Sequence, residues 1–138
     1  MKYKYFVSGR WRNRNNVREL ANKIREKGKT AYCFLDAGHS NHRLEKNPEE
    51  SMKEFEAIKN WREDKYVKQI FENDMDGLRQ SEVFVMLLPA GKSCHIEAGV
   101  AFGLGKRSIL IGEQTKTESL YLIFDKVYSN VDEFIATI

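Results

Sequence analysis

The chain has 138 residues, of which 41% are hydrophobic and 31% are charged, and its net charge is +3. This length fits one domain, residues 1–138, and the composition excludes a disordered chain. No apolar run approaches the roughly 20 residues that cross a bilayer, so we expect no membrane contact. The mild charge likewise gives no support to binding of a nucleic acid polymer.

The first quarter of the chain predicts two strands and one helix. Residues 5–8 read as a short buried strand, and no apolar signal-peptide stretch accompanies it, so we expect a cytoplasmic protein. Apolar residues at i, i+3, i+4 and i+7 predict a helix over 17–24, with Gly28 as its stop. A β-branched and aromatic run predicts the second strand over 30–35. The polar stretch 39–48 predicts a loop.

The middle of the chain predicts two helices, a strand and a further helix. Pro48 opens a helical region whose apolar side extends toward Trp61, and a second helix carries apolar residues over 66–78. The unbroken apolar run 83–88 is typical of a central parallel strand that is covered on both faces. A helix over 93–104 follows it.

The last part of the chain completes an alternation of strands and helices. Residues 108–111 predict a fourth strand, 126–128 a fifth, and 131–138 a closing helix capped by Ser129 or Asn130. The alternation predicts an α/β single domain, a parallel five-stranded sheet with helices on both faces in a flavodoxin- or Rossmann-like order. Ligands of such sheets bind beyond the carboxyl ends of the strands, so three segments become candidates: 8–14, 36–42 and 89–97.

Glu97 is the leading candidate for chemistry. With Ser93 as N-cap, Glu97 falls at the end of the first helical turn, where the helix dipole keeps a carboxylate ionised. Ile96, Val100 and Leu104 share another face, which we expect to pack on the sheet. The alternative is that Glu97 serves only as a favourable helix-start residue.

Several segments resemble the nucleoside 2-deoxyribosyltransferase superfamily, which includes the 2'-deoxynucleoside 5'-monophosphate N-hydrolases. They are residues 73–78 (NDMDGL), 81–85 (SEVFV), 97–99 (EAG), 103–106 (GLGK) and the Ser8-Gly9 pair after the first strand. The resemblance implies cleavage or transfer at the N-glycosidic bond of a nucleoside or nucleotide. It also implies that no cofactor or metal is needed, and that the chain forms a homodimer or a higher homo-oligomer.

The resemblance also implies roles for single residues. Glu97 occupies the position of the carboxylate nucleophile that attacks the anomeric carbon of the sugar. Asp74 matches a helix carboxylate near the base and sugar, and Tyr5 matches an aromatic hydroxyl that orients the nucleophile. These residue types suit the chemistry, because an anionic carboxylate stabilises an oxocarbenium-like state and a second carboxyl group helps to protonate the departing base.

The chain departs from the family six residues before Glu97. Transferases for unphosphorylated nucleosides carry Asp there and the monophosphate hydrolases carry Ser, whereas this chain has Gly91. Lys92, Ser93 and the amides at the helix start are candidates to hold a phosphate, with Arg10 or Arg12 facing them. The Gly-Lys-Ser sequence is not a P-loop, because the upstream glycine of that motif is missing.

Several other candidate site residues have more than one interpretation. His95 is either a proton shuttle or a capping-turn residue bonded to the backbone, and Cys94 is either a reactive thiol or a packing residue. Trp11 either stacks on a base or forms a lid or subunit contact. His39 and His42 have the spacing of a metal pair but lack a third ligand. The expected substrate-binding set is Ser8, Gly9, Arg10, Trp11, Gly91, Ser93 and His95.

Two functions compete with glycosyl chemistry on nucleosides. Toll/interleukin-receptor-like domains use a glutamate on a comparable scaffold to cleave the nicotinamide bond of NAD. A non-catalytic nucleotide-sensing module is the other alternative, in which Glu97 holds a ribose hydroxyl. Fold analogy cannot separate the three, because such sheets host many functions.

Overall fold

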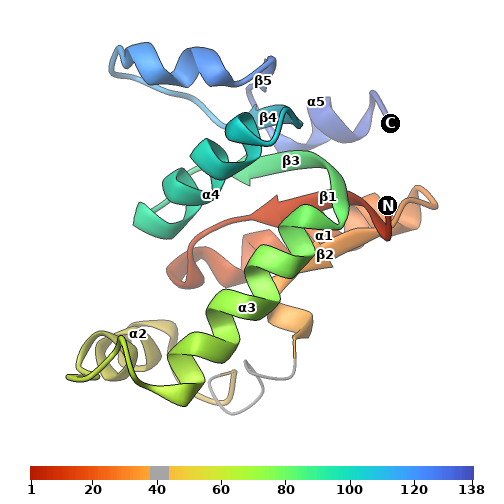
Figure 1. Cartoon of the computed structure of the whole chain (residues 1–138). Coiled ribbons are helices and arrows are strands. Elements are labelled where there is room, and N and C mark those ends of the chain that lie inside the picture. The colour runs from red at the N-terminus through yellow and green to blue at the C-terminus, as the bar shows by residue number, and fades with distance from the viewer. Residues whose placement is uncertain (38–43) are drawn as a thin grey trace.

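The computed structural model describes residues 1–37 and 44–138, and a five-stranded parallel sheet forms its centre (Figure 1). The strand order is β2-β1-β3-β4-β5. The strands are β1 (Tyr3–Ser8), β2 (Ala31–Cys33), β3 (Ser81–Leu87), β4 (Arg107–Ile111) and β5 (Lys126–Tyr128). This order confirms the predicted α/β single domain. The direction of strand succession reverses between β1 and β3, which places the expected binding crevice beyond their carboxyl ends.

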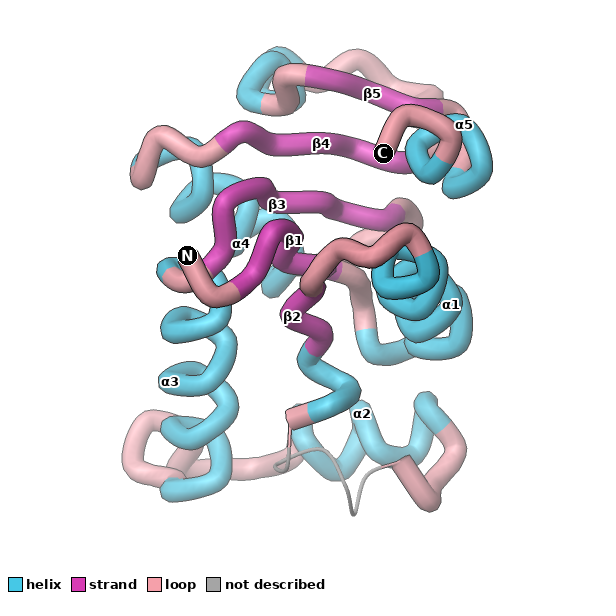
Figure 2. The backbone as a smooth tube through the Cα atoms, turned by 90° about the vertical axis from the view of Figure 1, so that its right-hand side faces the viewer, coloured by secondary structure: helices cyan, strands magenta, loops and turns pink. Residues whose placement is uncertain are grey.

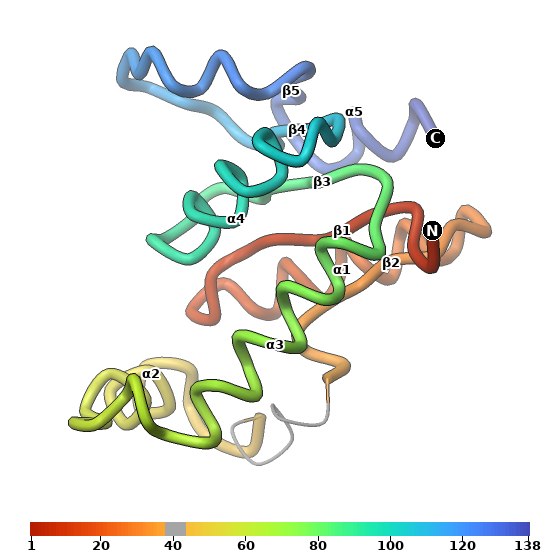
Figure 3. The backbone as a smooth tube through the Cα atoms, in the orientation of Figure 1, coloured from red at the N-terminus to blue at the C-terminus, as the bar shows by residue number. Residues whose placement is uncertain are grey.

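Helices cover both faces of the sheet (Figure 2). On one face lie α1 (Arg14–Glu26) and α5 (Val131–Ile135), and on the other lie α3 (Lys65–Arg79) and α4 (Lys92–Gly103). Helix α2 (Pro48–Glu56) lies beyond the edge of the sheet, beside the start of α3 (Figure 3). The described residues also form three short 3₁₀ helices: η1 (Trp11–Asn13), η2 (Phe34–Asp36) and η4 (Ser119–Ile123).

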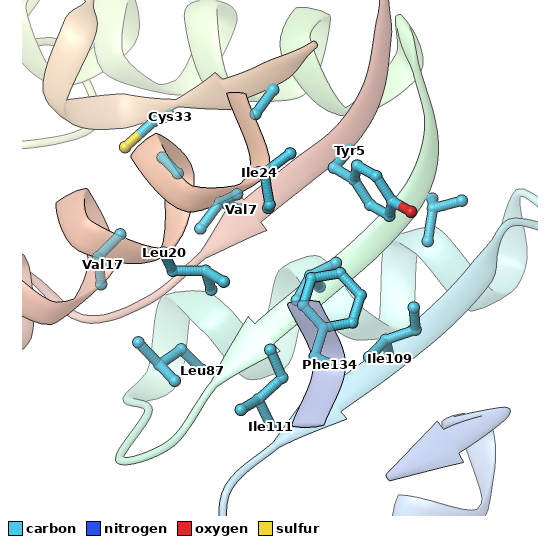
Figure 4. Close-up of a cluster of buried hydrophobic side chains, with 14 of the residues drawn as sticks. Tyr5, Val7, Val17, Leu20, Ile24, Cys33, Leu87, Ile109, Ile111 and Phe134 are labelled. Carbon is cyan, nitrogen blue, oxygen red and sulfur yellow. The ribbon is translucent and has the colours of Figure 1, made fainter. Parts of the chain in front are cut away.

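The two faces of the sheet bury two separate apolar clusters. Side chains of a strand alternate between faces, so β1 sends Tyr5 and Val7 toward α1, and Phe6 and Ser8 toward the other side. The cluster under α1 and α5 includes Phe134, which is fully buried (Figure 4). The cluster under α3 and α4 is built from Phe6, Leu78, Phe84, Met86, Cys94, Ala98, Ala101, Leu110 and Phe124.

Some predicted boundaries differ from the structure. The second strand ends at Cys33 rather than at residue 35, because the chain turns through η2 and buries Leu35 in the cluster under α1. Helix α2 ends at Glu56, before the apolar residues near Trp61. Asn130 caps α5 through a hydrogen bond from the backbone N–H of Glu133 to its Oδ1. Within residues 1–37 and 44–138, no helix is long and apolar enough to span a bilayer.

Candidate active site

A cavity of about 210 Å³ opens beside the start of α4, at the carboxyl ends of β1 and β3. Its walls come from the segment that follows β1, from α2, from α3 and from α4. The lining residues are Gly9, Arg10, Trp11, Arg12, Phe34, Met52, Phe55, Glu56, Ile70, Asp74, Gly91, Lys92, Ser93, Cys94 and Glu97. The structure therefore brings together Glu97, Asp74, Gly9, Arg10, Trp11, Gly91 and Ser93 of the predicted site.

Glu97 lies deep in the cavity and is held from β1. The hydroxyl of Ser8, the last residue of β1, donates a hydrogen bond of 2.7 Å to its Oε1. Burial and the negative charge of Asp74 raise the pKa of Glu97 to about 8, and the Ser8 hydrogen bond opposes both effects. The expectation that the helix dipole keeps Glu97 ionised is therefore wrong for the free protein, because desolvation favours the neutral acid.

Helix α4 begins earlier than predicted and packs through a different face. It starts at Lys92 after Gly91, which caps it without a side-chain hydrogen bond, so Glu97 falls in the second turn rather than the first. Ile96 and Leu104 are exposed, whereas Ala98 is buried on the side that carries Glu97. The prediction that Ile96 packs on the sheet failed because α4 has apolar residues around much of its circumference. The sequence pattern therefore does not distinguish the face that packs on the sheet from the exposed face.

Asp74 supplies a second carboxyl group from α3. The hydroxyl of Tyr32 on β2 donates a hydrogen bond of 2.8 Å to its Oδ1. Burial raises the pKa of Asp74 to about 6, while the Tyr32 hydrogen bond opposes this shift. Asp74 and Glu97 thus line one cavity, each with one oxygen held by a neutral hydroxyl and each with its charged form disfavoured by burial.

Tyr5 does not lie at this site. It is buried in the cluster under α1 and α5, with its ring edge-on to Phe134 at a centroid distance of 5.7 Å (Figure 4). The alternation of side chains along β1 places Tyr5 on the face opposite Ser8, so it cannot orient Glu97. The predicted role fails for this reason, and the tyrosine hydroxyl near the two carboxyl groups comes from Tyr32.

Tyr32 was missed because it lies on a different strand from the segments that carry the family resemblance. The register of the sheet pairs Tyr32 with Phe6, whose ring stacks on it at a centroid distance of 5.2 Å. Both residues thus share the sheet face of Ser8. Tyr32 could have been found from the alternation of side chains along the second predicted strand. Once the register with the first strand is fixed, that alternation places Tyr32 on the same face as Ser8.

The rim of the cavity carries positive charge. Arg10, Arg12, Lys92 and Ser93 all line it. Arg12 makes ion pairs with Glu49 and Glu56 of α2, at 2.7 and 3.0 Å, so its guanidinium already holds that helix against η1. The backbone carbonyl of Arg10 accepts a hydrogen bond from the N–H of Asn13, whereas its guanidinium forms no hydrogen bond or ion pair within residues 1–37 and 44–138. The charge of Arg10 is therefore available to a ligand.

Trp11 anchors the opposite wall. Its indole is buried, and its Nε1–H donates a hydrogen bond to Ser51 Oγ of α2. The preceding Gly9 allows this segment to lie close over α1, because a Cβ at position 9 would overlap the side chain of Val17. Trp11 therefore joins α2 to the cavity wall, and its ring still faces the cavity.

His95 and Cys94 are explained by local contacts. His95 lies outside the cavity lining, where its Nδ1 bonds the carbonyl of Gly91 and its Nε2 pairs with the hydroxyl of Tyr121, both at 2.7 Å. This is the capping-turn interpretation. Cys94 is buried, and burial raises the pKa of its thiol, contrary to a reactive thiolate. His39 and His42 lie outside the described residues.

Among residues 1–37 and 44–138, no three His, Cys, Asp or Glu side chains gather in a way that could hold a metal ion. The polar groups of the cavity are instead two carboxyl groups, their hydroxyl partners and a cationic rim.

Comparisons with known proteins find this fold in solved structures. No family model matches the sequence, and no curated protein matches it either. Among solved structures, a 2-deoxyribosyltransferase from Bacillus psychrosaccharolyticus matches with a TM-score of 0.64 and 11% identity, over 96% of this chain and 90% of that one. The CMP N-glycosidase BcmB of Clostridium botulinum matches with a TM-score of 0.57 and 17% identity, over 97% and 96%. Over nearly its whole length, the chain thus has the fold of the nucleoside 2-deoxyribosyltransferase type that its sequence segments resemble.

Proposed function

We propose that the protein cleaves the N-glycosidic bond of a nucleoside or nucleoside 5'-monophosphate in the cavity that holds Glu97 and Asp74. The observation that carries the proposal is the pairing of these two carboxyl groups, each bonded by one hydroxyl, in one cavity beyond β1 and β3. Two of the solved structures with this fold are named as a 2-deoxyribosyltransferase and as a CMP N-glycosidase. Both reactions break a bond between a sugar carbon and a base nitrogen.

The proposed reaction uses the two carboxyl groups in different roles. A carboxylate oxygen of Glu97 attacks the anomeric carbon while the bond to the base breaks and its electron pair moves to the base nitrogen. Asp74, in its acid form, donates a proton to that nitrogen. Water or a second base then attacks the same carbon of the glycosyl ester, which releases Glu97 as a carboxylate, and Asp74 takes the proton of the attacking group.

The two carboxyl groups together hold the one proton that the reaction needs, although in the free protein it rests on Glu97 and not on Asp74. The reaction needs one carboxylate and one carboxylic acid, hence one proton on the pair. With pKa values of about 8 for Glu97 and about 6 for Asp74, the pair holds one proton between these limits. In the free protein that proton resides mainly on Glu97, so catalysis requires its movement to Asp74 or to the base. We therefore expect a bell-shaped pH profile with limbs near pH 6 and pH 8.

The walls of the cavity suit a nucleotide of modest size. Aromatic and aliphatic side chains able to contact a base line one side: Trp11, Phe34, Met52, Phe55 and Ile70. Lys92 and Ser93 at the start of α4, together with Arg10 after β1, could bind a phosphate group. Pockets for drug-sized ligands measure about 300–1,000 Å³, so the cavity of about 210 Å³ favours a mononucleotide over a dinucleotide such as NAD.

The decisive experiment measures free base released from a panel of nucleosides, nucleoside 5'-monophosphates and NAD. We expect release from a monophosphate or nucleoside, and a loss of at least about a thousandfold in Glu97→Gln, because the variant lacks the nucleophile. Glu72→Gln, on the exposed surface of α3, is the matched control and should keep full activity. Tight binding without turnover, with Glu97→Gln changing affinity alone, would identify a nucleotide-sensing module instead.

We also propose that two or more copies associate. The described surface exposes Trp61 and Phe71, each more than half accessible, on and beside α3. A patch of this kind is a candidate subunit contact. Light scattering of the wild type and of Phe71→Ser should show an assembly that the substitution weakens, and a monomeric wild type would exclude it.

A further inference from the structure

Tyr32 makes the one hydrogen bond that reaches the carboxyl group of Asp74 within the described part of the chain. Its hydroxyl donates to Oδ1 over 2.8 Å and leaves Oδ2 without a bond from these residues. The two residues are 42 positions apart in the chain, and one belongs to β2 and the other to α3. This contact therefore depends on how the helix is placed against the sheet.

The ring of Tyr32 is fixed on several sides. It stacks on Phe6 with an angle of 10° between the ring planes, and Tyr3 meets it edge-on at a centroid distance of 5.6 Å. Helix α3 presents Gly77 at the closest point, where an added Cβ would come 2.6 Å from the ring. Gly77, which is buried, thus makes room for this tyrosine. A side chain confined in this way holds its hydroxyl in one place.

We propose that Tyr32 is the positioning residue of Asp74: it fixes one carboxyl oxygen as a hydrogen-bond acceptor and leaves the other for the departing base. The inference rests on the proposed function, because it assigns Tyr32 to the acid of that reaction. The charged or titratable groups that face Tyr32 are Asp74 from α3, Glu97 from α4 and Tyr3 from β1. None of them is a base that would take the Tyr32 proton.

The electrostatics of the contact support this role. Burial and the nearby negative charge of Asp74 raise the pKa of Tyr32 far above its ordinary value, so the hydroxyl keeps its proton and donates to Asp74 around neutral pH. The same hydrogen bond lowers the pKa of Asp74 against the effect of burial. Removing the hydroxyl should therefore raise the pKa of Asp74 and free its carboxyl group to rotate.

The test is Tyr32→Phe, which keeps the ring contacts with Phe6, Tyr3 and Gly77 and deletes the hydroxyl. Aspartate labelled with ¹³C at the carboxyl carbon, with Asp74→Asn to assign the signal, reports the titration of Asp74 directly by NMR. We expect its midpoint to rise by about one pH unit in Tyr32→Phe, the size of one lost hydrogen bond. Tyr3→Phe is the matched control, since the Tyr3 ring touches Tyr32 without bonding Asp74, and it should leave the titration unchanged.

Turnover provides the second readout. With the best substrate, we expect kcat of Tyr32→Phe to fall about tenfold with KM within twofold of wild type, and the acidic limb of the pH profile to move upward. An unchanged Asp74 titration, or an unchanged kcat and pH profile, would overturn the inference. If the wild type releases no base at all, the proposed function fails, and the NMR titration still decides whether Tyr32 holds Asp74.

Discussion

The two faces of the sheet differ in what lies under their helices. The face under α1 and α5, called the closed face, carries a continuous apolar cluster, whereas the face under α3 and α4, called the open face, also borders the cavity. Under α1 and α5, β1 contributes Tyr5 and Val7 to a continuous apolar cluster. Under α3 and α4, the same strand contributes Phe6 to the core and then Ser8, which is buried and bonds Glu97. At the last residue of β1, this face therefore presents a buried hydroxyl to a carboxyl group instead of an apolar side chain to the core. The closed face supplies stability, and the open face accepts buried carboxyl groups that oppose it.

The largest effect should follow a change on the closed face. Phe134→Ala removes a fully buried ring that contacts Tyr5 and Tyr128. We expect it to lower the free energy of unfolding by about 3–5 kcal/mol, measured by chemical denaturation. Phe102→Ala removes an exposed ring from α4 and is the matched control, with an expected change below about 0.5 kcal/mol. Equal losses in the two variants would contradict the burial of Phe134 in the cluster under α1 and α5.

The second effect tests whether the open face opposes stability. Because the pKa of Glu97 is about 8 in the folded protein and near 4.5 when unfolded, the folded state holds a proton that the unfolded state releases between these values. The contribution of Glu97 to stability is therefore present below pH 4.5 and lost as the pH rises toward 8. Glu97→Gln carries no such proton, so we expect it to exceed wild type by about 2–3 kcal/mol at pH 6.5 and to match it at pH 4.5.

Denaturation curves across this pH range measure the difference directly. Glu72→Gln is again the control, because its exposed carboxyl group should give a curve parallel to wild type. Parallel curves for Glu97→Gln as well would mean that Glu97 is ionised in the folded protein. That result would remove the shared proton from the proposed mechanism.

The third effect concerns the contact between α3 and β2 on the open face. Alanine normally favours a helix over glycine by about 1 kcal/mol. At Gly77, however, the new Cβ would lie 2.6 Å from the ring of Tyr32, which has no space to withdraw against Phe6. We expect Gly77→Ala to destabilise by about 1–3 kcal/mol and to reduce turnover. A variant as stable and as active as wild type would show that Tyr32 moves freely.

On the open face, the sequence predicted some features of the candidate site correctly and others wrongly. The sheet and its helices followed from alternating patterns of local sequence, and the strand-end rule pointed to Glu97 beside β1 and β3. The assignment of Tyr5 failed because a family resemblance carries a residue type but not the face of a strand. Tyr32 and the true packing face of α4 depend on register and on contacts between distant segments, which local periodicity does not contain.

The smallest effect should come from adding a Cβ at a helix glycine that has free space around it, in contrast to Gly77. Gly99 lies within α4 on its exposed side, and an added Cβ there would meet no atom within 4 Å. Only the helix propensity then changes, so we expect Gly99→Ala to stabilise the protein by about 0.5–1 kcal/mol, opposite in sign to Gly77→Ala. Denaturation of both variants at one pH tests the pair. A loss of stability in Gly99→Ala would mean that another surface, such as a second copy of the chain, already lies against α4 at this glycine.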